Sequence, residues 1–116
     1  SELFGARLTR VESAMCPRFH VDRVTLRLVC SYSGAGTEYV AGEHIDRRWL
    51  GHAAKGRSDQ ESGILHPGAV VHGAAAGDVV LLKGELWPDN AGRGAVHRSP
   101  AASPASPRLV LTLDPL

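Results

Sequence analysis

The clearest pattern in the chain lies between residues 24 and 32, where apolar and polar side chains alternate. Every second position there is apolar or aromatic: Val24, Leu26, Leu28, Cys30 and Tyr32. Because successive side chains of a strand point to opposite faces of a sheet, this period of two predicts a half-buried β-strand. The run Ser33-Gly34-Ala35-Gly36 has the composition of a turn and ends the strand.

Shorter stretches of the same kind follow along the chain, separated by Gly and Pro turns. They predict strands at residues 8–12, 37–40, 79–83, 95–97 and 109–114. Helical periodicity is weak and confined to residues 44–52. Short strands without strand–helix alternation favour an all-β fold, a sandwich or barrel of the jelly-roll kind. We expect one β-barrel-like domain over residues 1–116.

The stretch from residue 41 to residue 76 departs from this pattern. It is rich in Gly, Ala, charged residues and His, and shows no sustained alternation. A connection of this length without strands is usually functional or disordered. We therefore expect residues 41–76 to be a long loop or a lid insertion, and the four histidines in it to face solvent.

Composition narrows the class of protein. The chain has 116 residues, is 43% hydrophobic and carries a formal net charge of +1, as expected for one soluble domain. The near balance of charge argues against nucleic acid or an anionic membrane as the main partner. With no apolar run of membrane-spanning length and no secretory leader pattern, we expect a cytoplasmic protein with reduced thiols. The chain opens without Met, so we expect it to be a fragment of a longer protein.

The candidate chemistry begins at His20-Val21-Asp22, just before the predicted strand. Residues two apart on a strand face the same side, so His20 and Asp22 can bind one ion together, and His97 on a later strand can supply a third ligand. Two imidazoles and one carboxylate form the facial triad of non-haem Fe(II) sites, whose opposite side stays open. The alternative is a His–carboxylate hydrogen bond that pins a strand end. No Gly-rich phosphate loop or Gly-x-Ser-x-Gly motif is present, which excludes nucleotide-driven chemistry and serine hydrolysis.

A rival metal site exists in the same region. Four potential ligands lie close together in sequence: Cys16, His20, Asp22 and Cys30. They could bind zinc, although their spacing fits no finger-type pattern. Free cysteines are also common as apolar fillers of a core.

The spacing beyond His97 extends the metal hypothesis. Ten residues separate His97 from Arg108, whose guanidinium can bind a carboxylate through two parallel hydrogen bonds. The order His20-x-Asp22, His97, Arg108 resembles the His-x-Asp…His-x10-Arg pattern of Fe(II)/2-oxoglutarate dioxygenases. This resemblance implies a double-stranded β-helix, iron on the three ligands and the far carboxylate of 2-oxoglutarate on Arg108. Arg98 could replace Arg108 in binding this carboxylate. Tyr32 is expected near the cosubstrate, because it lies an even number of residues from Asp22 and should share its face of the strand.

At closer range the chain resembles a bacterial family catalogued as domain of unknown function 1826. The similar segments are Cys16-Pro17-Arg18-Phe19-His20-Val21-Asp22, Arg27-Leu28-Val29-Cys30-Ser31-Tyr32, Gly36-Thr37-Glu38, Leu82-Lys83-Gly84-Glu85, Trp87-Pro88 and Gly92-Arg93-Gly94-Ala95-Val96-His97-Arg98-Ser99-Pro100. The resemblance implies no settled activity. It implies that some members are encoded beside genes of zinc homeostasis. It also implies that relatives have more sequence before the first strand, so that an N-terminal part of the fold would be missing here.

Three hypotheses follow. The first is an Fe(II)/2-oxoglutarate-dependent oxygenase of the hydroxylase type, acting on an unknown small molecule or protein side chain. The second is a non-catalytic, cupin-like zinc-binding protein in metal homeostasis. The third is a β-domain that has lost its site and serves only for association.

Overall fold

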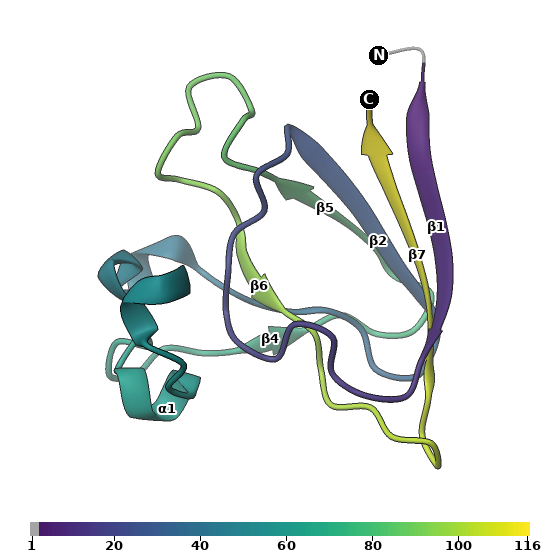
Figure 1. Ribbon diagram of the computed structural model, residues 1–116, viewed down its shortest axis with the longest axis horizontal. Coiled ribbons are helices and arrows are strands. Elements are labelled where there is room, and N and C mark those ends of the chain that lie inside the picture. Colours follow the sequence, from purple (N-terminus) through teal and green to yellow (C-terminus); the bar gives the residue numbers. More distant parts are fainter. Residues whose placement is uncertain (1–2) are drawn as a thin grey trace.

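The computed structural model describes residues 3–116 and is mostly β (Figure 1). Two antiparallel sheets contain all the strands in this part of the chain. The larger sheet has the order β1-β7-β2-β5, with the bounds Phe4–Val11, Arg108–Pro115, Leu26–Ser33 and Val79–Lys83. The smaller sheet has the order β4-β3-β6, with the bounds His72–Gly73, Glu38–Val40 and Val96–Arg98. The predicted all-β class is confirmed.

The strands predicted from alternation and apolar runs are present, with shifted ends. The first strand is longer than predicted because β1 pairs with β7 along its whole length, from Phe4 opposite Pro115 to Val11 opposite Arg108. The alternating strand begins at Leu26 rather than at residue 24. The two-residue strand β4 was not predicted, since a strand of that length carries no sequence periodicity.

The segment 41–76 has more structure than a loop or lid. It contains three 3-10 turns and one short α-helix: η1 (Gly42–His44), η2 (Arg47–Trp49), η3 (Gly51–Ala54) and α1 (Asp59–Ser62). These helices lie beside the smaller sheet in Figure 1. Ile45 and Ile64 from this segment are buried in one cluster with Phe19, Val40 and Val96. The segment therefore supplies the apolar core on its side of the smaller sheet.

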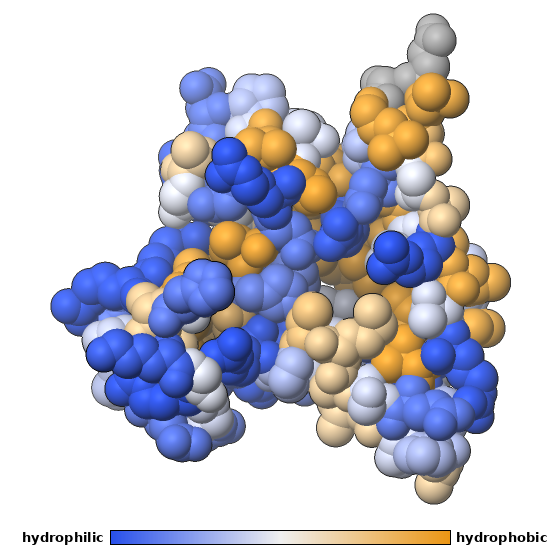
Figure 2. All heavy atoms as spheres, in the orientation of Figure 1, coloured by the Kyte–Doolittle hydropathy of each residue, from blue (hydrophilic) through white to orange (hydrophobic). Residues whose placement is uncertain are grey.

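The larger sheet has one buried face and one exposed face. The buried face carries a second apolar cluster, Val11, Val29, Leu82 and Val110, with Ala95 packed against it. The other face is also apolar but is open to solvent, and the exposed fractions of Leu8, Val79 and Leu81 are 60%, 61% and 61%. Figure 2 shows part of this apolar surface on the side where β1 lies. No helix among residues 3–116 is long and apolar enough to span a membrane.

Replacing Ile64 by Ala tests the packing role of the segment 41–76. Ile64 is 1% exposed, so Ile64→Ala should lower the free energy of unfolding by about 2–5 kcal/mol through lost burial and a residual cavity. Val70→Ala, at a residue of the same segment that is 56% exposed, should change it by less than about 0.5 kcal/mol. Urea unfolding measures both, and equal effects would show that Ile64 is not a core residue.

Candidate metal centre

Three side chains predicted to bind a metal converge in the structure. One potential ligand atom from each of His20, Asp22 and His97 lies within 4.8 Å of the other two. In residues 3–116 this is the only group of three or more His, Cys, Asp or Glu side chains with such spacing. His20 and Asp22 precede β2, and His97 is the central residue of β6. The group could hold a metal ion.

The backbone brings the two histidines together. His20 N–H donates to His97 O at 2.9 Å, and His97 N–H donates to His20 O at 3.0 Å. This reciprocal pair is an isolated antiparallel bridge that adds the His20 segment to the edge of β6. The two imidazole rings consequently lie with centroids 4.4 Å apart.

Both imidazoles are oriented by a carbonyl two residues earlier in the chain. His20 Nδ1 lies 2.9 Å from Arg18 O, and His97 Nδ1 lies 3.0 Å from Ala95 O. A carbonyl can only accept, so each Nδ1 carries a proton, and in the neutral form of each ring Nε2 keeps its lone pair. Metal-binding histidines are held in the same way, by a hydrogen bond from the ring nitrogen that does not bind the ion.

The Asp22 carboxylate faces both free ring nitrogens. Oδ1 lies 3.5 Å from His20 Nε2, and Oδ2 lies 3.1 Å from His97 Nε2. Oδ2 is buried and has no hydrogen bond of good geometry, although His97 Nε2 and Arg27 Nη1 are both close to it. A cation between the two imidazoles would satisfy this orphaned oxygen.

The charges around Asp22 keep it ionised. Burial by itself would raise the pKa of the carboxyl, but the adjacent imidazoles of His20 and His97, which can donate to it when protonated, and the nearby Arg27 charge outweigh burial and hold the pKa far below its ordinary value. For His20, burial opposes protonation, and the contacts with Asp22 and Arg18 O overcome it and raise the imidazole pKa. The site therefore holds a negative charge that attracts cations.

Arg27 fixes the position of Asp22 from β2. Its Nη1 lies 3.0 Å from Asp22 Oδ2, while Nε and Nη2 donate to the two oxygens of Asp114 on β7 at 2.7 and 2.8 Å. Such a bidentate pair is geometrically specific, so the guanidinium has little freedom. The contact joins the segment His20-Val21-Asp22 to the centre of the larger sheet.

Gly84 allows the backbone of residues 22–24 to approach the end of β5. A Cβ placed on Gly84 would overlap the Val24 carbonyl and lie 2.8 Å from Asp22 O. Glu85 N–H donates to Asp22 O at 3.0 Å across the same contact. Any larger residue at position 84 would push the backbone of Asp22 away.

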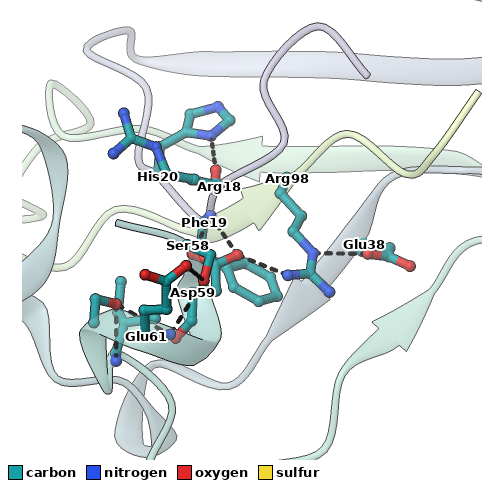
Figure 3. Close-up of polar contacts among 10 residues, drawn as sticks. Arg18, Phe19, His20, Glu38, Ser58, Asp59, Glu61 and Arg98 are labelled. Carbon is teal, nitrogen blue, oxygen red and sulfur yellow. Dashed lines mark hydrogen bonds and ion pairs between the residues drawn. The ribbon is translucent and has the colours of Figure 1, made fainter. Parts of the chain in front are cut away.

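The residue before His20 is held by the helical segment (Figure 3). Both oxygens of Asp59, at the start of α1, accept from Phe19 N–H at 3.1 and 3.2 Å. Arg98 Nη1 donates to Asp59 Oδ2 at 2.6 Å, and Arg98 Nε donates to Glu38 Oε1 at 2.8 Å. Asp59 is 5% exposed, so this charge is buried and paired. We call Phe19, Asp59 and Arg98 the Asp59 clamp.

The three residues expected to bind a cosubstrate have different surroundings in the structure. Arg98 is engaged by Glu38 and Asp59. Arg108 is 3% exposed and donates to Ala35 O and Ser31 Oγ. Tyr32 is 56% exposed. The argument that strand alternation places Tyr32 on the same face as Asp22 is wrong, because residues 23–25 form a bend between Asp22 and β2.

The rival cysteine site is not assembled. Cys30 is buried within β2 and Cys16 is exposed, and neither thiol belongs to the group of convergent ligands found in residues 3–116. Cys16 nevertheless lines a cavity of about 290 Å³ together with His20, Met15 and Phe19.

Sequence reasoning missed the residues that hold the ligands in place. Asp59 was not singled out because it lies 40 residues from Phe19 in a segment with no strand pattern. Asp114 ends the predicted last strand, and its pairing with Arg27 follows only from the register that puts Leu28 opposite Leu113.

The Asp59 clamp makes a measurable prediction. Asp59→Asn removes the negative charge opposite Arg98 and leaves only one side-chain oxygen to accept from Phe19 N–H. The substitution should therefore lower the free energy of unfolding by about 2–3 kcal/mol. Hydrogen exchange of the Phe19 amide, followed by NMR, should accelerate more than that of amides in β7. Glu61→Gln, on the exposed side of α1, is the matched control and should change neither quantity. Unchanged exchange at Phe19 would contradict the clamp.

Comparisons with known proteins give one match. The family described as "Protein of unknown function (DUF1826)" matches residues 2–114, which include the whole triad. No curated protein and no solved structure matches the chain significantly. None of these comparisons links the chain to the 2-oxoglutarate dioxygenases. Because the match extends over almost the entire sequence, the chain belongs to the DUF1826 family.

Proposed function

We propose that this protein is an Fe(II)- and 2-oxoglutarate-dependent oxygenase of the hydroxylase type, with His20, Asp22 and His97 as the iron ligands. The observation that carries the proposal is the convergence of two Nε2 lone pairs and an ionised carboxylate, one of whose oxygens is buried without a hydrogen bond. This donor set is typical of non-haem Fe(II) sites that keep coordination positions open for other ligands. The side chains of His20 and Asp22 are 28% and 13% exposed, which leaves access from solvent.

The strand arrangement supports a double-stranded β-helix. If the His20 segment, which bridges to His97, is counted as a strand, the larger and the smaller sheet each have four members. The chain then passes from one sheet to the other after β1, after the His20 segment, after β2, after β4, after β5 and after β6. Crossing between two facing antiparallel sheets is how a jelly roll is built.

A buried cation supports an anionic cosubstrate. Arg108 lies on the face of β7 that also carries Val110, and only neutral acceptors contact its guanidinium, Ala35 O and Ser31 Oγ. No carboxylate among residues 3–116 forms an ion pair with it. Desolvation lowers the pKa of Arg108, but a guanidinium stays protonated at neutral pH. Because buried charges are usually paired, we assign the far carboxylate of 2-oxoglutarate to Arg108.

The protein's part in such a reaction is to position and to hold charge. Bound iron would supply the activation of O₂: 2-oxoglutarate would lose CO₂ and be oxidised to succinate, which would take one oxygen atom, and the substrate would take the other as a hydroxyl group. The carbonyls of Arg18 and Ala95 keep both Nε2 atoms free for the ion. The contacts with His20 and His97, together with the Arg27 charge, keep Asp22 ionised, and Arg27 also fixes its position, so the site is ready for the cation before it binds.

A second function, zinc binding for delivery or regulation, has one observation in its favour. The cavity beside His20 is also lined by Cys16 and Met15, whose sulfur atoms are soft ligands. Two histidines and one carboxylate also suit zinc of the catalytic type. An exposed thiol next to such a site is suited to receiving or passing on the ion.

Spectroscopy of the iron-loaded protein tests the proposed function. Under anaerobic conditions, Fe(II) with 2-oxoglutarate should give a weak visible charge-transfer band. His97→Ala should abolish the band and lower Fe(II) affinity by more than about 100-fold, since it removes a ligand rather than a supporting group. Arg108→Met should leave Fe(II) binding within a few-fold and weaken the band. His72→Ala, at an exposed histidine stacked on Tyr39, is the control and should behave as the wild type.

The same experiment separates the two functions. A folded protein that binds Fe(II) but gives no band at saturating 2-oxoglutarate would remove the oxygenase. Zinc bound more tightly than iron, with affinity reduced by Cys16→Ser as well as by His97→Ala, would favour the zinc protein. Metal binding that survives His97→Ala would contradict both.

A further inference from the structure

The outer edge of β5 has free hydrogen-bonding groups. Gly84 N–H donates to Thr25 O at 3.0 Å, which makes residues 25 and 84 a hydrogen-bonded pair of the β2–β5 ladder. In an antiparallel ladder such pairs alternate, so the backbone groups of Val79, Leu81 and Lys83 point away from β2. Lys83 O is satisfied by Ala95 N–H at 2.9 Å. No hydrogen bond from the rest of the described chain reaches the outward groups of Val79 and Leu81.

A groove runs along this edge. Its volume is about 600 Å³, and β5 forms one wall with residues 79–82. The opposite wall comes from Val40, Val96 and the turn around Gly94. The bond between Ala95 and Lys83 closes the groove at one end. The strand β5 is about 17 Å long for its five residues. Its free outward groups lie between Val79 and Leu81.

A guanidinium without a charged partner lies at the closed end. Arg47 Nη2 donates to Gly94 O at 3.1 Å, whereas Nη1 is buried and has no hydrogen-bond partner. No ion pair involving Arg47 is formed within residues 3–116, and a second cation, Arg93, also lines the groove. A buried donor that lacks an acceptor is costly. Because Arg47 also lines the groove and has no charged partner, its guanidinium is suited to binding a carboxylate.

We infer that this groove binds an extended peptide segment bearing a carboxylate, which adds to the larger sheet as a further strand beside β5 and places the carboxylate on Arg47. The free groups of Val79 and Leu81 provide the main-chain hydrogen bonds of strand addition. The apolar walls take alternate side chains of the peptide, and Arg47 sets its register. Open edges of this kind are usually covered or charged in proteins that do not use them.

The groove is separate from the metal centre. None of His20, Asp22 and His97 lines it, and the Val96 side chain on its wall belongs to the apolar cluster with Ile45 and Ile64. Peptide binding therefore does not depend on the proposed oxygenase activity. It can be tested on the metal-free chain.

The probe is a fluorescein-labelled pentapeptide in which Thr and Val alternate before a terminal Glu. Fluorescence anisotropy should show about tenfold tighter binding than for the same peptide ending in Gln with an amidated terminus, because a charge-assisted hydrogen bond to Arg47 is lost. Methylation of alternate backbone nitrogens of the peptide should abolish binding. Arg47→Ala should remove the preference for Glu, and Arg48→Ala should keep it, since the neighbouring Arg48 is exposed and paired with Asp46.

Three results would overturn the proposal, and all of them need only the wild-type protein. One is equal binding of the Glu and Gln peptides, or no binding of either. Another is full binding of the N-methylated peptide, which would show that no strand is added. The third is displacement of the pentapeptide by glutarate at equal concentration, which would show a site for small anions only.

Discussion

The Asp22 carboxylate, held between two imidazoles and one guanidinium, is the interaction on which the site depends. Each of the three partners comes from a different part of the fold: His20 from the segment before β2, His97 from β6 and Arg27 from β2. Their contacts with the carboxylate keep Asp22 ionised against the cost of burial. Neutral surroundings of similar burial would leave the carboxyl protonated and unable to bind a cation.

The rest of the fold can be read as support for this carboxylate. The larger sheet fixes Arg27 through Asp114, and the smaller sheet fixes His97 through its pairing with Tyr39. The helical segment holds the backbone next to His20 through Asp59. Its apolar residues Ile45 and Ile64 pack against Phe19, the residue before His20. A segment expected to be a lid thus holds the backbone next to His20.

The three side chains that converge could be predicted from sequence, but the residues that support them could not. His20, Asp22 and His97 have a recognisable order because each ligand type and spacing is restricted by the chemistry of the ion. Asp59 and Asp114 act through contacts 40 and 87 residues apart in the chain, which no local pattern specifies. The argument for Tyr32 failed for a local reason, since a bend before β2 breaks the alternation on which it rested. Strands were predicted well where one face is buried, and β4 was missed because it has only two residues.

Anomalous diffraction at the iron and zinc absorption edges, from crystals grown with both metals in excess, is the most direct test of the metal centre. A single peak is expected at about 2.0–2.2 Å from Nε2 of His20, Nε2 of His97 and a carboxylate oxygen of Asp22, and it should be strongest at the iron edge. A peak at Cys16 alone, or no peak at the triad in metal-saturated crystals, would contradict the assignment of these three residues as ligands.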